Sequence, residues 1–537
     1  MNQHALNRPQ LDVQKLSTAG PETWKPYLPA LIAVVGSLVL VVIRLNVNGE
    51  HFISDEALMM LALAAYLIAV VFLFTDLYAP LRFAEQAGKW AATIGVFFNL
   101  SSWLVRWVAG YDRELAIFID QGLSSSQMPW VFRYVPFANL YDLSLAFAFG
   151  AGITTLIIMR KRFQSVAALS LLMSTMVLIL ARFIGSEFID LPPVLDSYWR
   201  PIHVGIASMS YGVALVCFAV AVLYLIKDGL QVEKIAVCTC LFGVAVFGSI
   251  SKFSVFAIDS LGTYRASVMN GSSRTALALR ADIPHVGWLM VTAAALLIAA
   301  AILLASYVAG ADRTYRRWGI RSLYAALIAQ AACVVTLIYQ IRTVGSVISL
   351  IDPSQFRTFS VWMLQQQGST ADQVSAMGQQ QLYDIGNTWV TENALQLYLG
   401  VNANPVELAA LITAFTATLF VLILSMDTEK IRSTLPELEK LDALMYKLAG
   451  VAFAGLALLL MTGAIWANES WGRYWGWDSK EVGALVAWLA YAGFLHSRIA
   501  YGWRGRRSAY FAVAAFIFII FTYLGVSYLL PGLHSYA

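Results

Sequence analysis

Four tryptophans lie within twelve residues of this sequence, at Trp466, Trp471, Trp475 and Trp477. The charged segment Asp478–Glu481 follows them at once. Tryptophan is common at membrane interfaces, but an interfacial belt does not explain the neighbouring charges. Flat aromatic faces beside charged groups predict a site for a flat, apolar, anionic ligand. The alternative is a helix-packing segment that also carries an interfacial belt.

Small residues recur in the same stretch. If the segment is helical, four of them fall at i, i+4, i+7 and i+11 on one face: Gly472, Gly476, Ser479 and Gly483. That stripe would be a smooth surface for a flat ligand, with Arg473 or Lys480 available for its acidic groups. Asp478 is expected either to hydrogen-bond the loop backbone or to orient Lys480.

The chain has only six histidines: His4, His51, His203, His285, His496 and His534. Neutral imidazole is a common axial ligand of haem iron. His203 and His534 each adjoin an apolar run, which makes them candidates for a ligand pair. His496 lies inside the apolar run after the tryptophan stretch, about ten Å short of the membrane side opposite that stretch. An ordinary hydrogen-bonded histidine is the alternative for each of the three.

The composition indicates the class of protein in which these residues lie. Hydrophobic residues make up 59% of the 537 residues and charged residues only 13%, whereas an average soluble domain has about 25% charged residues. So few charges cannot coat a large soluble surface, and the same composition excludes disordered, collagen-like and disulfide-rich secreted proteins. The four cysteines form no C-x-x-C pair, which argues against a dithiol oxidoreductase and a covalent haem carrier.

Thirteen apolar runs could each span a membrane, which takes about 20 residues: 27–45, 57–75, 90–108, 141–159, 165–185, 204–226, 235–257, 286–308, 322–341, 407–425, 447–465, 481–499 and 509–530. Only helices or closed barrels satisfy backbone groups in lipid. The sequence therefore predicts an all-α, polytopic transmembrane helical bundle of about 13 spans.

The loops between the runs sort by charge. Lys and Arg gather in every second loop, as at Arg160–Arg162 and Arg313–Arg321, and the positive-inside rule makes those loops cytoplasmic. The N-terminus is then cytoplasmic and the C-terminus outside. The less basic loops lie outside: 109–140, 186–203, 258–285, 342–406 and 466–480. His203, His534 and the tryptophan stretch therefore share the outer interface, and the Gln-rich loop 342–406 is expected to hold short surface helices.

The stretch from Trp466 to Arg498 resembles the WWD signature of haem-handling membrane proteins, W-A-N-E-S-W-G-R-Y-W-G-W-D-S-K-E with L-H-S-R further on. It is most similar to the CcsA/ResC family of cytochrome c maturation (system II). Three further segments resemble markers of that family: Pro136–Asp142, Ser197–Val204 and Leu530–Tyr536. The resemblance covers roughly residues 130–255 and 447–537.

By this resemblance, His203 and His534 match the two external haem-ligand histidines, and His496 matches the histidine of an inner, intramembrane haem site. All three are expected metal ligands of haem b, which is the transported ligand. The second ligand of the inner site comes from a CcsB/Ccs1/ResB-type membrane protein. The expected haem-binding residues are His203, His496, His534, Trp471, Trp475, Trp477, Asp478, Gly476, Arg473 and Lys480. No catalytic residue is assigned.

The resemblance implies haem delivery across the membrane and attachment to apocytochrome c with a C-x-x-C-H motif. The chain would act as a haem lyase (cytochrome c synthase) component with its CcsB-type partner. A thiol-reducing thioredoxin-like protein is a further partner, and nucleic acid is not expected. The implied location is the bacterial inner (plasma) membrane, or the thylakoid membrane in a phototroph.

Two alternative functions stay open from the sequence. One is a CcmF/CcmC-like haem-handling component of system I, which shares the tryptophan motif. The other is a non-haem membrane anchor or transporter subunit whose aromatic residues bind only lipid or quinone. A haem stain or a visible spectrum of the purified protein separates these alternatives.

The sequence departs from the family pattern in three places. Ser479 replaces the usual Pro after the motif Asp, and Gly483 replaces the usual Trp. Six predicted spans separate His203 from Trp466, where the family has about two. The predicted organisation is a cytoplasmic tail (1–25), an N-terminal bundle with the first external histidine (26–257), an insertion-like region with extra spans (258–446) and a WWD domain (447–537).

Overall fold

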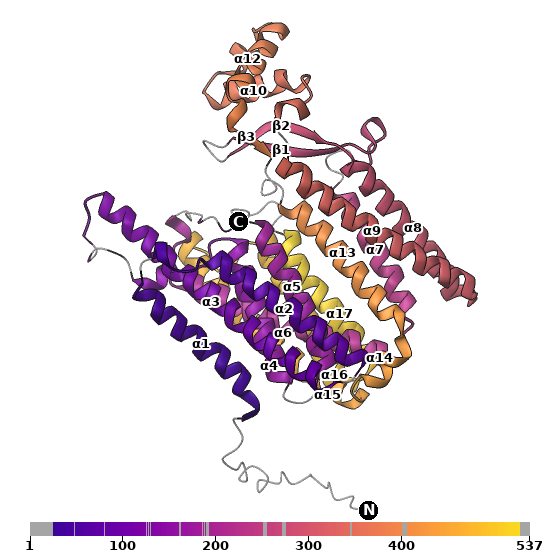
Figure 1. Cartoon of the computed structure of the whole chain (residues 1–537). Helices are drawn as coiled ribbons and strands as arrows, with labels where there is room; N and C mark the ends of the chain where they lie inside the picture. Colours follow the sequence, from indigo (N-terminus) through magenta and orange to yellow (C-terminus); the bar gives the residue numbers. More distant parts are fainter. Residues whose placement is uncertain are drawn as a thin grey trace, which may run out of the picture.

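The structure is a computed structural model that describes residues 25–526, except for 48, 80, 125, 127, 129, 160–162, 185, 187, 189–192, 251–254, 271–274, 344–345 and 400–404. Helices dominate the described residues, so the protein is all-α and polytopic, as predicted. The first nine helices are α1 Leu28–Leu45, α2 Asp55–Tyr78, α3 Arg82–Asp120, α4 Leu140–Met159, α5 Gln164–Ile184, α6 Trp199–Lys227, α7 Val232–Ile250, α8 Val286–Gly310 and α9 Arg313–Thr343. The others are α10 Gln355–Gln366, α11 Ala371–Ser375, α12 Gln379–Glu392, α13 Pro405–Met426, α14 Thr428–Thr434, α15 Leu438–Trp471, α16 Ser479–Ala500 and α17 Arg506–Ile520, which continues into a π-helix at Phe521–Gly525 (Figure 1).

Every predicted apolar run coincides with a long helix, but not every one of these helices is strongly apolar. Among the described residues, ten helices are long and apolar enough to cross a membrane, or eleven if the bent pair Leu411–Met426 and Thr428–Thr434 is one span. Helix α3 is not among the ten, and it buries the polar side chains of Asn99, Ser102 and Arg106 inside the bundle. The count of thirteen spans stays a prediction.

Buried side chains form two hydrophobic clusters. The first joins α1–α6 with α15–α17, and the second joins α7–α9, α13 and the short outer elements. Helix α13 contacts α5, α7 and α9, and so links the two clusters. In Figure 1, α8 and α9 lie beside the main bundle, and α10 and α12 stand beyond the ends of the long helices.

A small antiparallel sheet of order β2-β1-β3 lies among the helices, a feature that the sequence prediction missed. Its strands are β1 Tyr264–Asn270, β2 Thr275–Ile283 and β3 Leu397–Leu399. The outer edge of β2 is bound by Gln355 of α10, whose Nε2 donates to Arg280 O and whose Oε1 accepts from Arg280 N, both at 2.9 Å. The short helices expected in the Gln-rich loop are present as α10, α11 and α12.

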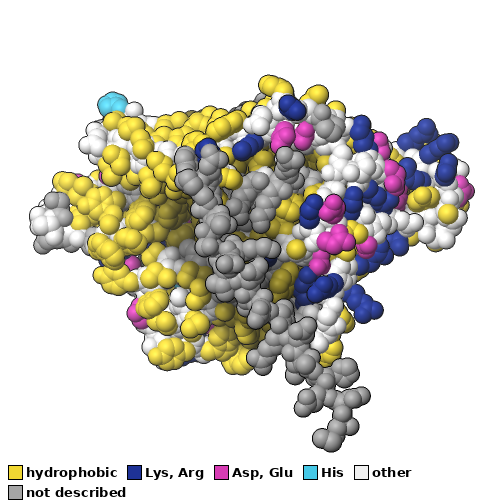
Figure 2. All heavy atoms as spheres, turned by 90° about the horizontal axis from the view of Figure 1, so that it is seen from below, with side chains coloured by type: hydrophobic (Ala, Val, Ile, Leu, Met, Phe, Trp, Pro, Cys, Tyr) yellow, Lys and Arg dark blue, Asp and Glu magenta, His cyan; other side chains and the backbone are white. Residues whose placement is uncertain are grey.

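Lys and Arg side chains gather over part of the face seen from below in Figure 2, the face at which α1 begins in Figure 1. Arg432 of α14 donates to the carbonyl oxygens of Ile226 and Leu230, each at 2.9 Å, and ties α14 to the end of α6. Arg506 at the start of α17 pairs with Asp228 at 2.6 Å. This face is the one predicted to be cytoplasmic, and the direction of insertion stays a prediction.

Candidate functional site

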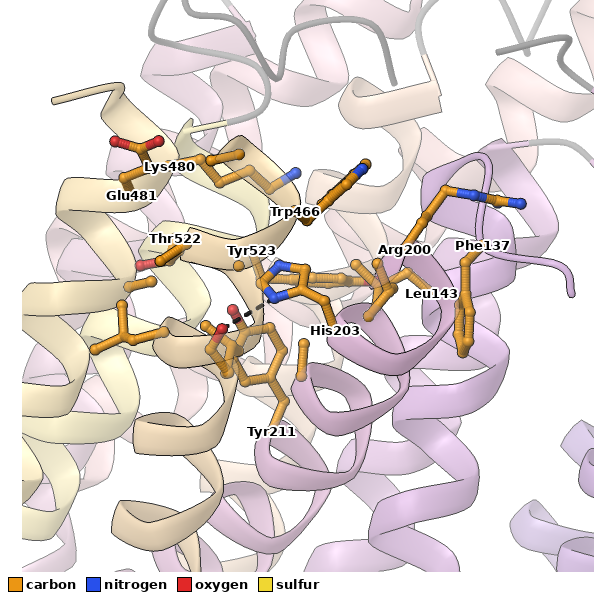
Figure 3. A pocket seen from close by; sticks show the side chains of 18 of the residues that line it. Phe137, Leu143, Arg200, His203, Tyr211, Trp466, Lys480, Glu481, Thr522 and Tyr523 are labelled. Atoms are coloured by element: carbon orange, nitrogen blue, oxygen red, sulfur yellow. Dashed lines mark hydrogen bonds between the residues drawn. The ribbon is translucent and has the colours of Figure 1, made fainter. Parts of the chain in front are cut away.

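The ends of α6, α15 and α16 that face the predicted outer side surround a cavity (Figure 3). The loop before α4 and the π-helix after α17 complete its wall. The space between these side chains, counted together with the solvent that it opens to, is about 1130 Å³. Aromatic side chains dominate the lining: Phe137, Tyr211, Trp466, Trp471, Tyr474, Trp475 and Tyr523. The cavity therefore suits a mostly apolar ligand.

His203, in the second turn of α6, lies in this cavity. Its Nδ1 is 3.0 Å from the carbonyl oxygen of Leu459 on α15. A carbonyl oxygen can only accept, so the contact requires a proton on Nδ1 and leaves the lone pair of the neutral ring on Nε2. A hydrogen bond of this kind fixes the tautomer and ring orientation of metal-binding histidines. In the neutral ring, Nε2 is therefore the nitrogen of His203 that carries the lone pair.

The approach of His203 to α15 depends on a glycine. A Cβ atom at position 463 would lie 2.7 Å from Cε1 and 3.0 Å from Nδ1 of the imidazole ring. Such contacts are shorter than van der Waals separation, so the ring fits here only because residue 463 is a glycine. The neighbouring ring of Trp466 lies 5.7 Å from the imidazole, centroid to centroid, and is buried.

The tryptophan stretch is not one helix, and the predicted stripe of small residues is wrong. Helix α15 ends at Trp471 because Gly472 adopts a left-handed conformation with φ of 69°, and residues 472–478 form a loop. A new helix, α16, begins at Ser479. The glycine breaks the helix at the point where the i+4 periodicity was expected to continue.

Asp478 is the N-cap of α16. Its Oδ2 accepts from the backbone N–H of Lys480 at 3.1 Å, and the Glu481 side chain accepts from the backbone N–H groups of Gly476 and Asp478 at 2.8 and 3.3 Å. This capping box ties the loop to the helix. Of the two roles considered from the sequence, Asp478 has the first, since it hydrogen-bonds the backbone.

The loop divides the remaining predicted residues into two groups. Trp471, Trp475 and Lys480 line the cavity. Trp477 does not line it and is 74% exposed, and Arg473 is exposed. Gly476 faces Arg473, because a Cβ there would lie 2.7 Å from the guanidinium and not in the cavity.

Several residues that the sequence interpretation did not single out also form the site. Phe137 lines the cavity from the loop before α4. That loop is held by Trp103, whose indole N–H donates to Pro136 O at 3.2 Å, and by Arg200, whose Nη2 donates to Arg133 O at 2.6 Å. The family-like segment Pro136–Asp142 was the available signal.

A buried arginine holds the same loop from inside the bundle. Arg106 of α3 is 1% exposed and forms ion pairs with Asp142 and, at 3.2 Å, with Asp55. Asp142 also accepts from the backbone N–H of Ala138 at 2.9 Å. Removing one partner of such a buried pair costs about 3–5 kcal/mol, so this network fixes the loop that carries Phe137.

The π-helix after α17 brings Tyr523 into the cavity wall. The hydroxyl groups of Tyr523 and Ser144 of α4 lie 2.5 Å apart. The neighbouring residue of the π-helix, Thr522, faces α16, and a Cβ atom at Gly483 would lie only 2.8 Å from its Oγ1. The π-helix therefore fills the space that a larger side chain at position 483 would need. This explains why glycine stands here in place of the family's usual Trp.

The other two predicted histidines lie apart from this cavity or outside the described residues. His496 is exposed on α16, four residues before the helix ends, and its ring contacts Tyr501. At 1.5 Å per residue it is about 25 Å along α16 from Ser479. His534 lies outside the described residues.

Comparisons with known proteins point in one direction. The model of the family described as "Cytochrome C assembly protein" matches residues 137–534, more than half of the chain. The "Cytochrome c biogenesis protein CcsA" of Prochlorococcus marinus strain MIT 9515 is 54% identical over 98 residues, 18% of this chain and 31% of the relative. The CcsA proteins of Gloeobacter violaceus (49% over 98 residues) and Guillardia theta (50% over 99 residues) match 18% of this chain and 29% and 33% of their own lengths. The chain thus spans about a third of the length of these curated relatives.

Proposed function

This chain belongs to the family of cytochrome c assembly proteins, and on that premise we propose that it delivers haem to the outer face of the membrane and attaches it to apocytochrome c. It would act as the CcsA-like component of a system II synthase. The observation that carries the proposal is the aromatic cavity around His203, whose Nδ1–H is held by Leu459 O and whose Nε2 keeps the lone pair.

The protein's main task in this reaction would be to position the haem and the apocytochrome thiol. Addition of a cysteine thiol across a haem vinyl group forms one carbon–sulphur bond and moves the thiol hydrogen to carbon, with no further co-reactant. The protein's own residues would hold the iron through His203 and cover the porphyrin with Trp471 and Trp475. We propose His534 as the second axial ligand, because its position follows the last span at the same predicted level.

We further propose two separate haem sites. His496 is about 25 Å along α16 from the end that borders the cavity, so it cannot share an iron with His203. Its exposure on the surface of the bundle supports a second ligand from a CcsB-type partner chain. The expected membrane is the bacterial inner membrane, or the thylakoid membrane in a phototroph.

The rival functions lead to different expectations. The curated relatives named above are CcsA proteins, which favours system II over a CcmF/CcmC-like role. A membrane anchor or a transporter that binds only lipid or quinone would bind no haem, and His203 would then be an ordinary hydrogen-bonded residue. Such a protein would therefore show no Soret band when purified.

The test is reconstitution in a bacterial host that lacks its own cytochrome c maturation genes. We expect this chain, together with a CcsB-type protein, to attach haem covalently to a reporter apocytochrome with a C-x-x-C-H motif. Each protein alone is the control. Absence of covalently bound haem on a reporter that is stably produced would contradict the proposal.

A further inference from the structure

Lys480 places a cation in a cavity that is otherwise largely apolar. It is the second residue of α16, and its side chain lines the cavity with Nζ pointing toward Trp466 (Figure 3). Among the described residues, its ammonium group takes part in no hydrogen bond or ion pair. The acid that attracts it, Asp478, accepts instead from the backbone N–H of Lys480.

The other acid at the cavity does not neutralise this charge. The carboxylate of Glu481 accepts from the backbone N–H groups of Gly476 and Asp478, so it is turned into the loop. An ammonium group without a partner in a largely apolar cavity is stabilised when an anion joins it. The cavity therefore favours a ligand that brings its own acidic group to Lys480.

Arg200 also lines the cavity, but its guanidinium points away from His203 and Lys480 (Figure 3). Its Nη2 donates to Arg133 O at 2.6 Å and its Nη1 donates to Val135 O at 3.5 Å, so the guanidinium is bound to the loop before α4. Arg473, the other cation considered from the sequence, is exposed and outside the lining. Lys480 is therefore the cation that a carboxylate at the edge of a flat ligand would meet in this cavity.

We infer that Lys480 recognises a carboxylate of the porphyrin, so that the pocket selects an acidic porphyrin over an uncharged one of the same shape. This inference rests on the proposed function and specifies how its ligand is chosen and oriented. The ligand class is an iron porphyrin with free propionate side chains.

The experiment compares two ligands that differ only in charge, haem and its dimethyl ester. Each is titrated into detergent-solubilised full-length protein from haem-depleted cells, and binding is followed in the Soret band. Hydrogen bonds to charged groups stabilise by an amount that corresponds to about tenfold or more in affinity. We expect haem to bind at least about tenfold more tightly than the ester.

Variants locate the source of this preference. Lys480→Met keeps the length of the side chain and should lower the preference for haem by about tenfold, whereas Lys480→Arg should retain it. Arg473→Met removes a neighbouring exposed charge and should leave the preference unchanged.

Equal affinity of the wild-type protein for haem and ester would overturn the inference while leaving haem binding intact, and so would an undiminished preference in Lys480→Met. Failure of both porphyrins to bind would instead overturn the proposed function, and the inference with it.

Discussion

At the scale of single residues, the site depends on how one imidazole ring is held. The sequence singled out His203 by its place at the outer interface and by resemblance, but it could not show which ring nitrogen carries the proton. That information comes from a contact between residues 256 positions apart, Nδ1 of His203 and the carbonyl oxygen of Leu459. No local pattern of residue types predicts such a contact, because it depends on how α6 packs on α15.

Gly463 gives a prediction at this scale. Gly463→Ala should push the imidazole away from Leu459 O, because the new Cβ would lie 2.7 Å from Cε1. Loss of a ligand-orienting contact typically lowers affinity about 10–100-fold, and we expect a fall of that size in haem affinity. The measurement is a Soret titration. Gly450→Ala, in the same helix with nothing near its Cβ, is the control, and equal affinities in the two variants would refute the role of Gly463.

At the scale of elements, the long helices could be predicted and the tryptophan loop could not. Each apolar run became a helix because burial in lipid requires it. The stretch 472–478 has the periodicity of a helix, but Gly472 ends α15 and the Asp478 capping box starts α16. The hairpin of β1 and β2 was missed because it lies in a loop between spans, and apolar runs predict only the spans.

The loop geometry separates two neighbouring tryptophans. Trp475 lines the cavity, whereas Trp477 is 74% exposed and lies outside it. Trp475→Ala removes an aromatic face worth about 1.5–3 kcal/mol of apolar burial, so we expect a fall in haem affinity of about tenfold or more. Trp477→Ala should change affinity less. A larger loss in Trp477→Ala, at equal thermal stability, would favour an interfacial belt over a ligand platform.

At the scale of the whole molecule, the chain combines the bundle that contains the aromatic cavity with a second packed unit. The buried side chains of α7–α9, α13 and the outer sheet form their own cluster. We keep the division into 26–257, 258–446 and 447–537 as a proposal, with α7 packed on the side of the added region. The composition predicted a polytopic bundle, but hydrophobicity alone cannot tell which spans pack together.

The exposed His496 leads to a prediction about assembly. Coexpression with a CcsB-type partner should raise the haem content of the purified complex above that of this chain alone, because the partner supplies the missing ligand. His496→Ala should cancel that gain and leave the outer site unchanged. Haem content is measured by pyridine haemochrome assay, and a full second equivalent of haem in this chain without a partner would rule out a shared site.

The central claim is that His203 ligates haem iron in the aromatic cavity through Nε2, and the visible spectrum of one variant tests it most directly. In His203→Gly, purified in detergent, the low-spin haem spectrum of the wild-type protein should be lost, because one axial ligand is gone. Added imidazole should restore it by binding in the space that the side chain has left. A His203→Gly protein whose haem content and spectrum equal those of the wild type, with no response to imidazole, would contradict the account.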